Sequence, residues 1–61
     1  MVVEHGFWRI EMNIKKRDGH KYYICSHKNN PSMLELVFVK GEKLTGKKEL
    51  VDIIKKEVRG I

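Results

Sequence analysis

Apolar and polar residues alternate over residues 7–15. The even positions of this stretch are Trp8, Ile10, Met12 and Ile14, and the odd positions are mostly polar. A period of two predicts a strand with one buried face and one solvated face. Asp18 and Gly19 follow, and an Asp-Gly pair is typical of a hairpin turn, so YYIC at residues 22–25 is predicted to lie in a second strand.

The length of that turn decides which side chains of the second strand face the core, because a slip of one residue inverts a strand. A two-residue turn places Tyr23 and Cys25 in the core, whereas a three-residue turn with Gly19 in a left-handed bulge places Tyr22 and Ile24 there. We favour the three-residue turn, because it buries Ile24 and leaves a consistently polar outer face. That outer face then displays Arg9, Lys15, Lys21, Tyr23 and His27.

A third strand, MLELVFVK at residues 33–40, is apolar on both sides. The side expected to face the core carries Leu34, Leu36 and Phe38. On the other side, Val37 and Val39 are more apolar than a solvated face needs. We therefore expect these two valines, with Phe7, to form a covered patch, either under the N-terminal residues or against a second copy of the chain.

Gly46 to Arg59 is predicted to form an amphipathic helix, with Thr45 as its N-cap and Gly60 as its C-cap. Its apolar stripe consists of Leu50, Ile53, Ile54 and Val58. On the opposite face, Asp52 lies at ion-pairing distance along the helix from Lys48 and Lys56. The expected fold is a single α+β domain over residues 1–61, in which a three-stranded antiparallel sheet packs on one C-terminal helix in the order β-β-β-α.

The charge balance favours acidic partners. Thirteen Lys and Arg residues against eight Asp and Glu give a net charge of +5, and residues 15–28 hold five of these cations beside both tyrosines. Several cations together neutralise a phosphate backbone, and an aromatic ring among them can stack on a base or sugar. We expect the hairpin and the outer sheet face to bind nucleic acid, double-stranded DNA rather than RNA, although a merely solubilising hairpin tip remains the alternative. The expected contact residues are Arg9, Asn13, Lys15, Lys16, Arg17, Lys21, Tyr23 and His27.

The predicted β-β-β-α order with the cationic hairpin RDGHKYYI at residues 17–24 is similar in outline to two groups of DNA-binding domains. One is the arm-site-binding module of some integrases, and the other is the plant ethylene-response domain. Both insert the exposed face of the sheet into the major groove, and the resemblance implies the same docking here. The tryptophan and arginine pattern of the plant domain is missing from this sequence, so no site residue is transferred.

The sequence predicts no catalytic, metal or cofactor site. Cys25 and His27 share a strand face, but a structural zinc site usually needs four such ligands in pairs. Glu4, Glu11 and Glu35 are scattered, and so short a chain can hardly enclose a pocket for acid-base chemistry. We therefore expect a non-enzymatic protein in which Cys25 is a small apolar filler.

A second candidate class is a small protein-binding effector or inhibitor, such as a viral one. It would act through the patch of Phe7, Val37 and Val39 or through an edge strand, with a homodimer forming through the same patch. The N-terminus MVVEHGFWRI predicts neither a signal peptide nor a membrane span, which favours an intracellular protein, cytoplasmic or nucleoid-associated. Abundant Lys, Glu, Ile and Val without any Ala or Gln is typical of a thermophile or its virus, or of AT-rich coding.

Overall fold

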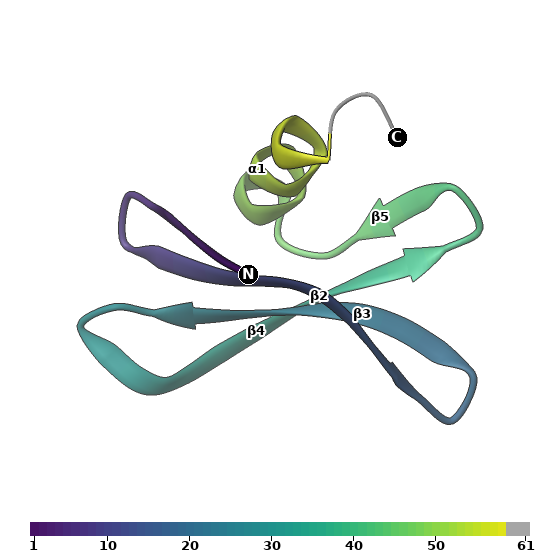
Figure 1. The fold of residues 1–61 in the computed structure, drawn as a ribbon, viewed down its shortest axis with the longest axis horizontal. Coiled ribbons are helices and arrows are strands. Elements are labelled where there is room, and N and C mark those ends of the chain that lie inside the picture. Colours follow the sequence, from purple (N-terminus) through teal and green to yellow (C-terminus); the bar gives the residue numbers. More distant parts are fainter. Residues whose placement is uncertain (59–61) are drawn as a thin grey trace.

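The structure, a computed structural model, describes residues 1–58. Its elements are β1 (Val2–His5), β2 (Trp8–Arg17), β3 (His20–His27), β4 (Asn30–Lys40), β5 (Lys43–Thr45) and α1 (Lys48–Glu57). Each strand pairs antiparallel with the next one along the chain, so the sheet order is β1-β2-β3-β4-β5. The sheet curves around α1 as a half-barrel (Figure 1). The α+β class is as expected, but the three-stranded sheet is wrong, because β1 and β5 extend it to five strands.

The turn between β2 and β3 contains two residues, and this overturns the predicted three-residue turn. Arg17 pairs with His20, and Asp18 and Gly19 between them have φ angles of 51° and 80°. Positive φ at both central residues is the signature of a type I′ turn, whose twist matches that of the flanking strands. The resulting register turns Tyr23, not its neighbour Tyr22, toward the helix.

Strand β2 is irregular in its middle. Glu11 pairs with Ile24 and Lys15 with Tyr22, so four steps along β2 match only two along β3. An irregularity of this kind leaves residues unpaired and bends the strand. It also removes Ile14 from the core position that the alternating pattern predicted, and Ile14 is 47% exposed.

The core lies between α1 and the concave face of the sheet. The sheet contributes the buried residues Trp8, Ile10, Tyr23, Cys25 and Val37, and the helix contributes Leu50, Val51, Ile53 and Ile54. The predicted helical stripe therefore faces the sheet, with Val51 buried in addition. At the start of the helix, the Lys47 ammonium group lies 5.0 Å from the centre of the Trp8 ring, a cation–π contact that ties α1 to β2.

The face of β4 that packs against the helix is opposite to the predicted one. Val37 pairs with Tyr23, and directly paired residues share a face, so the burial of Tyr23 brings Val37 into the core. The residues predicted for the core, which instead lie on the other face, are Leu34, Leu36 and Phe38. Because Val37 is fully buried and Val39 packs against the core, the patch expected from these valines and Phe7 does not form on the surface.

The helix begins later than predicted. Thr45 ends β5, and its hydroxyl donates a hydrogen bond to the Phe38 carbonyl at 3.5 Å instead of capping the helix. Lys47 precedes the first helical residue and makes no side-chain capping bond. Arg59 and Gly60, the predicted last helical residue and C-cap, lie outside the described residues. Over residues 1–58, no helix is long and apolar enough to cross a membrane.

The ion pairs predicted along the helix are absent from the structure. Asp52 forms no salt bridge with Lys48 or Lys56. Within residues 1–58, the one salt bridge joins the Lys28 ammonium group to the Glu4 carboxylate at 3.3 Å, between the β3–β4 turn and β1. The cations of the β2–β3 hairpin thus carry no carboxylate partner from the described part of the chain.

Candidate nucleic-acid interface

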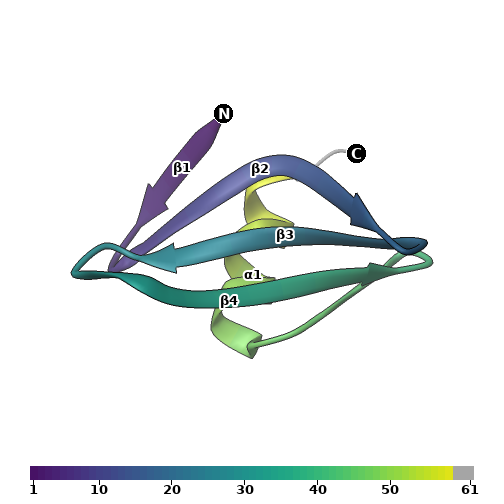
Figure 2. The ribbon, with the colours of Figure 1, turned by 90° about the horizontal axis from the view of Figure 1, so that it is seen from below.

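The face of the sheet that points away from α1, here called the open face, is not covered by any other element of residues 1–58. Figure 2 looks onto it, with α1 behind the strands. Cross-strand pairing arranges its side chains in rows, since paired residues share a face. The rows are Glu4, Arg9, Ser26 and Leu34; then Val2, Glu11, Ile24 and Leu36; then Lys15, Tyr22, Phe38 and Thr45; and last Arg17 and His20.

The middle of the open face is apolar and aromatic. Leu34 is 57% exposed and Phe38 is 40% exposed, which is high for large apolar side chains. The rings of Tyr22 and Phe38 lie 5.8 Å apart at a tilt, and the His20 ring meets Phe38 edge-on at 6.5 Å. These three residues are named the aromatic cluster below. His20 and Phe38 are exposed and Tyr22 is half-buried, and no other element of the described part of the chain lies over this side of the sheet (Figure 2).

Cations border the aromatic cluster. Lys15 is the cross-strand partner of Tyr22, and Arg17 is the partner of His20. Neither cation forms a salt bridge with any carboxylate of residues 1–58. Lys40 and Lys43 form one further pair at the turn between β4 and β5. Positive charge therefore surrounds exposed rings at this end of the sheet.

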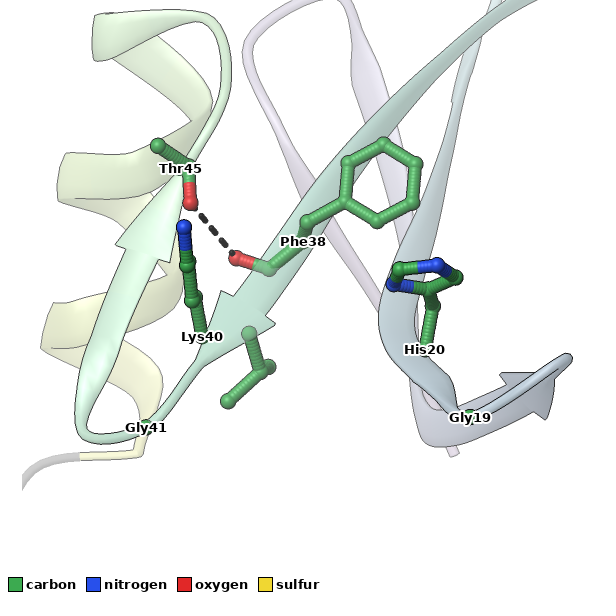
Figure 3. A pocket seen from close by; sticks show the side chains of 7 residues that line it. Gly19, His20, Phe38, Lys40, Gly41 and Thr45 are labelled. Carbon is green, nitrogen blue, oxygen red and sulfur yellow. Dashed lines mark hydrogen bonds between the residues drawn. The ribbon is translucent and has the colours of Figure 1, made fainter.

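Two shallow hollows mark the open face, and a larger cleft lies at its end. One hollow, of about 240 Å³, is lined by Val2, Arg9, Glu11, Ile24, Ser26 and Leu34. The other, of about 200 Å³, is lined by Arg17, Asp18, His20, Tyr22, Leu36 and Phe38. The distal cleft, of about 700 Å³, opens between the β2–β3 and β4–β5 turns (Figure 3). Its lining residues are Gly19, His20, Phe38, Val39, Lys40, Gly41 and Thr45.

The structure divides the predicted hairpin cations between the two faces. Lys15 and Arg17 lie on the open face near the end of β2, and Arg9 lies on the same face at the start of the strand. Lys16 and Lys21 pair with each other on the opposite face, on the side of the helix. The prediction that Lys15 and Lys21 share one face is therefore wrong, because the two-residue turn and the irregularity in β2 reset the register.

Three further predicted contact residues lie away from the open face or are engaged within the fold. The Asn13 side-chain amide donates to Glu11 Oε1 at 3.1 Å. Tyr23, predicted on the outer face, is only 6% exposed and belongs to the core, so that placement is wrong. His27 is half-buried, and its ring stacks on Phe7 at 5.7 Å between ring centres.

Several residues of this interface were not among the predicted contacts. They are His20, Tyr22, Leu36, Phe38 and Lys40. The signal that identifies most of them is the Asp18-Gly19 dipeptide, which favours a two-residue turn. That turn pairs Arg17 with His20, and the next residues outward on the same face are Lys15 and Tyr22.

The described residues show no arrangement for metal binding or thiol chemistry. Within residues 1–58, no three His, Cys, Asp or Glu side chains gather closely enough to hold a metal ion. Burial, helped by the nearby Glu35 carboxylate, raises the pKa of the Cys25 thiol to about 11. The thiolate is the reactive form, so Cys25 is inert at neutral pH.

Comparisons with protein-family models, curated proteins and solved structures gave no match. The outline resemblance to three-stranded DNA-binding domains does not extend to the sheet, which has five strands.

Proposed function

We propose that the protein binds nucleic acid, in the first place double-stranded DNA, through the open face of its sheet. The row that joins Lys15, Tyr22 and Phe38 carries this proposal, because it places a cation beside the half-buried Tyr22 ring and in line with the exposed Phe38 ring. Phosphates attract the cation, and the rings contact sugars or bases. Arg17 and His20 repeat the combination in the next row.

The charge of the open face supports an anionic ligand. Arg9, Lys15 and Arg17 lie on the same face of β2. Glu11 and Asp18 also lie on this side, but neither forms a salt bridge with these cations within residues 1–58, and a third acid, Glu4, is paired with Lys28. Within residues 1–58, no salt bridge neutralises Arg9, Lys15 or Arg17, and the whole chain has a net charge of +5, which favours an anionic ligand.

The shape of the sheet supports a duplex. The sheet wraps around α1 with its two edges turned toward the helix, so the open face is convex (Figure 1). The strands at the crest of a convex sheet can enter the groove of a duplex and approach base edges while flanking cations contact phosphates. Side chains that are charged at the rim and apolar in the middle match a groove lined by two phosphate backbones.

The salt dependence of binding tests this proposal. The double variant Lys15→Ala, Arg17→Ala removes two cations of the open face. With a short generic duplex, the slope of log affinity against log salt should fall by about 1.8, since each phosphate contact contributes about 0.9. Fluorescence anisotropy between about 50 and 200 mM salt measures that slope.

The matched control is the double variant Lys16→Ala, Lys21→Ala. It removes the same charge from the same hairpin but from the opposite face. We expect its slope to stay within about 0.5 of the wild-type value, because only the open face contacts the backbone. An equal decrease of the slope in both variants would show that the hairpin attracts DNA only through its overall charge. An unchanged slope in both variants would reject the open face as the binding surface.

A protein partner is the second candidate, and the exposure of Leu34 and Leu36 favours it. An apolar strip of this kind is also typical of a docking surface for a protein or for a second copy of the chain. Analytical ultracentrifugation with and without the duplex separates the two functions. A tight dimer that does not bind DNA would replace the first proposal with this one.

A further inference from the structure

The distal cleft combines the groups that recognise a nucleotide. One wall comes from the β4–β5 hairpin and carries Lys40, Gly41 and Thr45, and the other comes from Gly19 and His20 of the β2–β3 hairpin (Figure 3). Its volume of about 700 Å³ falls within the range of about 300–1,000 Å³ that is usual for small-ligand sites. The two hollows of the open face are smaller than that range.

Phe38 and His20 connect the distal cleft to the open face. Both residues line the cleft and also the neighbouring hollow that contains Tyr22 and Arg17. The pair therefore forms a partition of ring surface, with a cationic residue on either side, Arg17 in the hollow and Lys40 in the cleft. A strand that leaves the open face at this end passes directly over the partition.

We infer that the distal cleft receives one unpaired nucleotide, with its base against Phe38 and its phosphate at Lys40. This inference rests on the proposed function and specifies the nucleic acid as a duplex with an unpaired end. A base must be unstacked to lie against a side-chain ring, and an already unpaired base avoids that cost. The Lys40 side chain extends along β5 toward Thr45, on the wall facing His20 (Figure 3).

The charges around the cleft agree with a phosphate ligand. Lys40 forms no salt bridge with any carboxylate of residues 1–58. Asp18 and Glu42 are the sequence neighbours of Gly19 and Gly41, the two turn glycines that line the cleft. Neither of these two acids is itself a lining residue. A nucleoside monophosphate has an aromatic base and a dianionic phosphate, and the cleft has aromatic rings for the base and Lys40 for the phosphate.

Lys43 supplies a matched control for Lys40. The two lysines form one cross-strand pair, but only Lys40 lines the cleft. Adenosine monophosphate, titrated into labelled protein and followed by NMR, should shift the amides of Gly19, His20, Lys40, Gly41 and Thr45. Lys40→Met should weaken this binding about tenfold, since a hydrogen bond to a charged group contributes roughly 1.5–3 kcal/mol, whereas Lys43→Met should change it less than twofold.

Any one of three results would overturn the inference. Equal weakening by the two lysine variants would show nonspecific charge attraction, and equal affinity for inorganic phosphate would show that the base contributes nothing. A duplex with a short single-stranded overhang should bind about tenfold more tightly than its blunt counterpart, because stacking of one base contributes about 1–3 kcal/mol. Blunt-duplex binding without an overhang preference would reject the cleft and leave the open-face proposal standing, whereas binding of adenosine monophosphate without any duplex affinity would reject the open face alone.

Discussion

The orientation of β4 predicts which of two truncations in this strand lowers the free energy of unfolding more. Val37 is fully buried under the helix, and Leu34 is 57% exposed on the open face. Val37→Ala removes two buried carbon groups, at about 0.8 kcal/mol each, and leaves a cavity, so the free energy of unfolding should fall by about 2 to 3 kcal/mol. Leu34→Ala removes three such groups, but they are less than half buried and border on solvent. The free energy of unfolding should therefore fall by only about 1 kcal/mol.

Thermal unfolding followed by circular dichroism measures both changes. In a domain of this size, about 1 kcal/mol shifts the Tm by roughly 4–8 °C. Val37→Ala should therefore lower the Tm by about 10 to 20 °C, and Leu34→Ala by less than about 8 °C. If Leu34 faced the core, as the alternating pattern first suggested, its truncation would cost about 2–5 kcal/mol and exceed that of Val37. That order would refute the orientation, whereas complete unfolding of the Val37 variant would support it.

The same two variants separate stability from binding. Leu34 belongs to the open face, and its truncation should weaken duplex binding while the protein stays folded. Val37 lies on the other side of the sheet, so its variant should bind normally at temperatures where it is folded. A folded Leu34 variant with wild-type affinity would argue that the apolar middle of the open face makes no contact with the ligand.

Two further predictions concern close packing and pH. A side chain at Gly46 would bring its Cβ to 3.1 Å from the Leu36 carbonyl oxygen and 3.2 Å from the Val37 Cα. Gly46→Ala should therefore lower the free energy of unfolding by a net 1 to 2 kcal/mol, which is about 1–3 kcal/mol of overpacking less about 0.4–1 kcal/mol gained from a stiffer unfolded chain. Urea unfolding measures this change, and an unchanged midpoint would contradict the close approach. The raised pKa of Cys25, about 11 against 9.0, means that the unfolded thiol ionises first as the pH rises, so the free energy of unfolding should fall between pH 9 and 11, by at most about 3 kcal/mol. Cys25→Ala should lack this part of the slope, and an equal slope in both proteins would assign it to other groups.

The amphipathic patterns of the sequence predicted the core side of two elements correctly. Trp8 and Ile10 lie in the core, as the alternation in β2 indicated, and the helical stripe that includes Leu50 and Ile54 faces the sheet. These predictions hold because each pattern is a local property of one element. Where an element begins is less local, and so the helix start was placed too early, at Gly46 instead of Lys48.

The faces of β3 and β4 could not be assigned from the sequence alone. Tyr22 and Leu36 were correctly predicted to share one face, but the choice of which face meets the helix depends on a single turn. Polarity argued for burying Ile24, because Cys25 and Tyr23 look less apolar than their neighbours. Turn geometry decided otherwise, and the unpaired residues of β2 then aligned Ile10 with Cys25, which no alternation pattern reveals.

The two short edge strands were missed for a similar reason. β1 and β5 have four and three residues, too few for an alternation to be visible. Each is joined to its neighbour by a two-residue turn that begins with a glycine at φ +61°, Gly6 before β2 and Gly41 after β4. A glycine at the first turn position is a recognised hairpin signal, and it is the one clue to these strands in the sequence.

The strand order β1-β2-β3-β4-β5 has a consequence for the way the chain assembles. Every hairpin joins neighbours in sequence, so the sheet can grow one turn at a time without closing a long loop, and rapid folding is expected. Only α1, last in chain order, must find partners on several strands at once. Until it docks, Trp8 and Val37 face solvent on one side while Leu34 and Phe38 do so on the other, and this two-sided apolar intermediate is the species most exposed to self-association during synthesis.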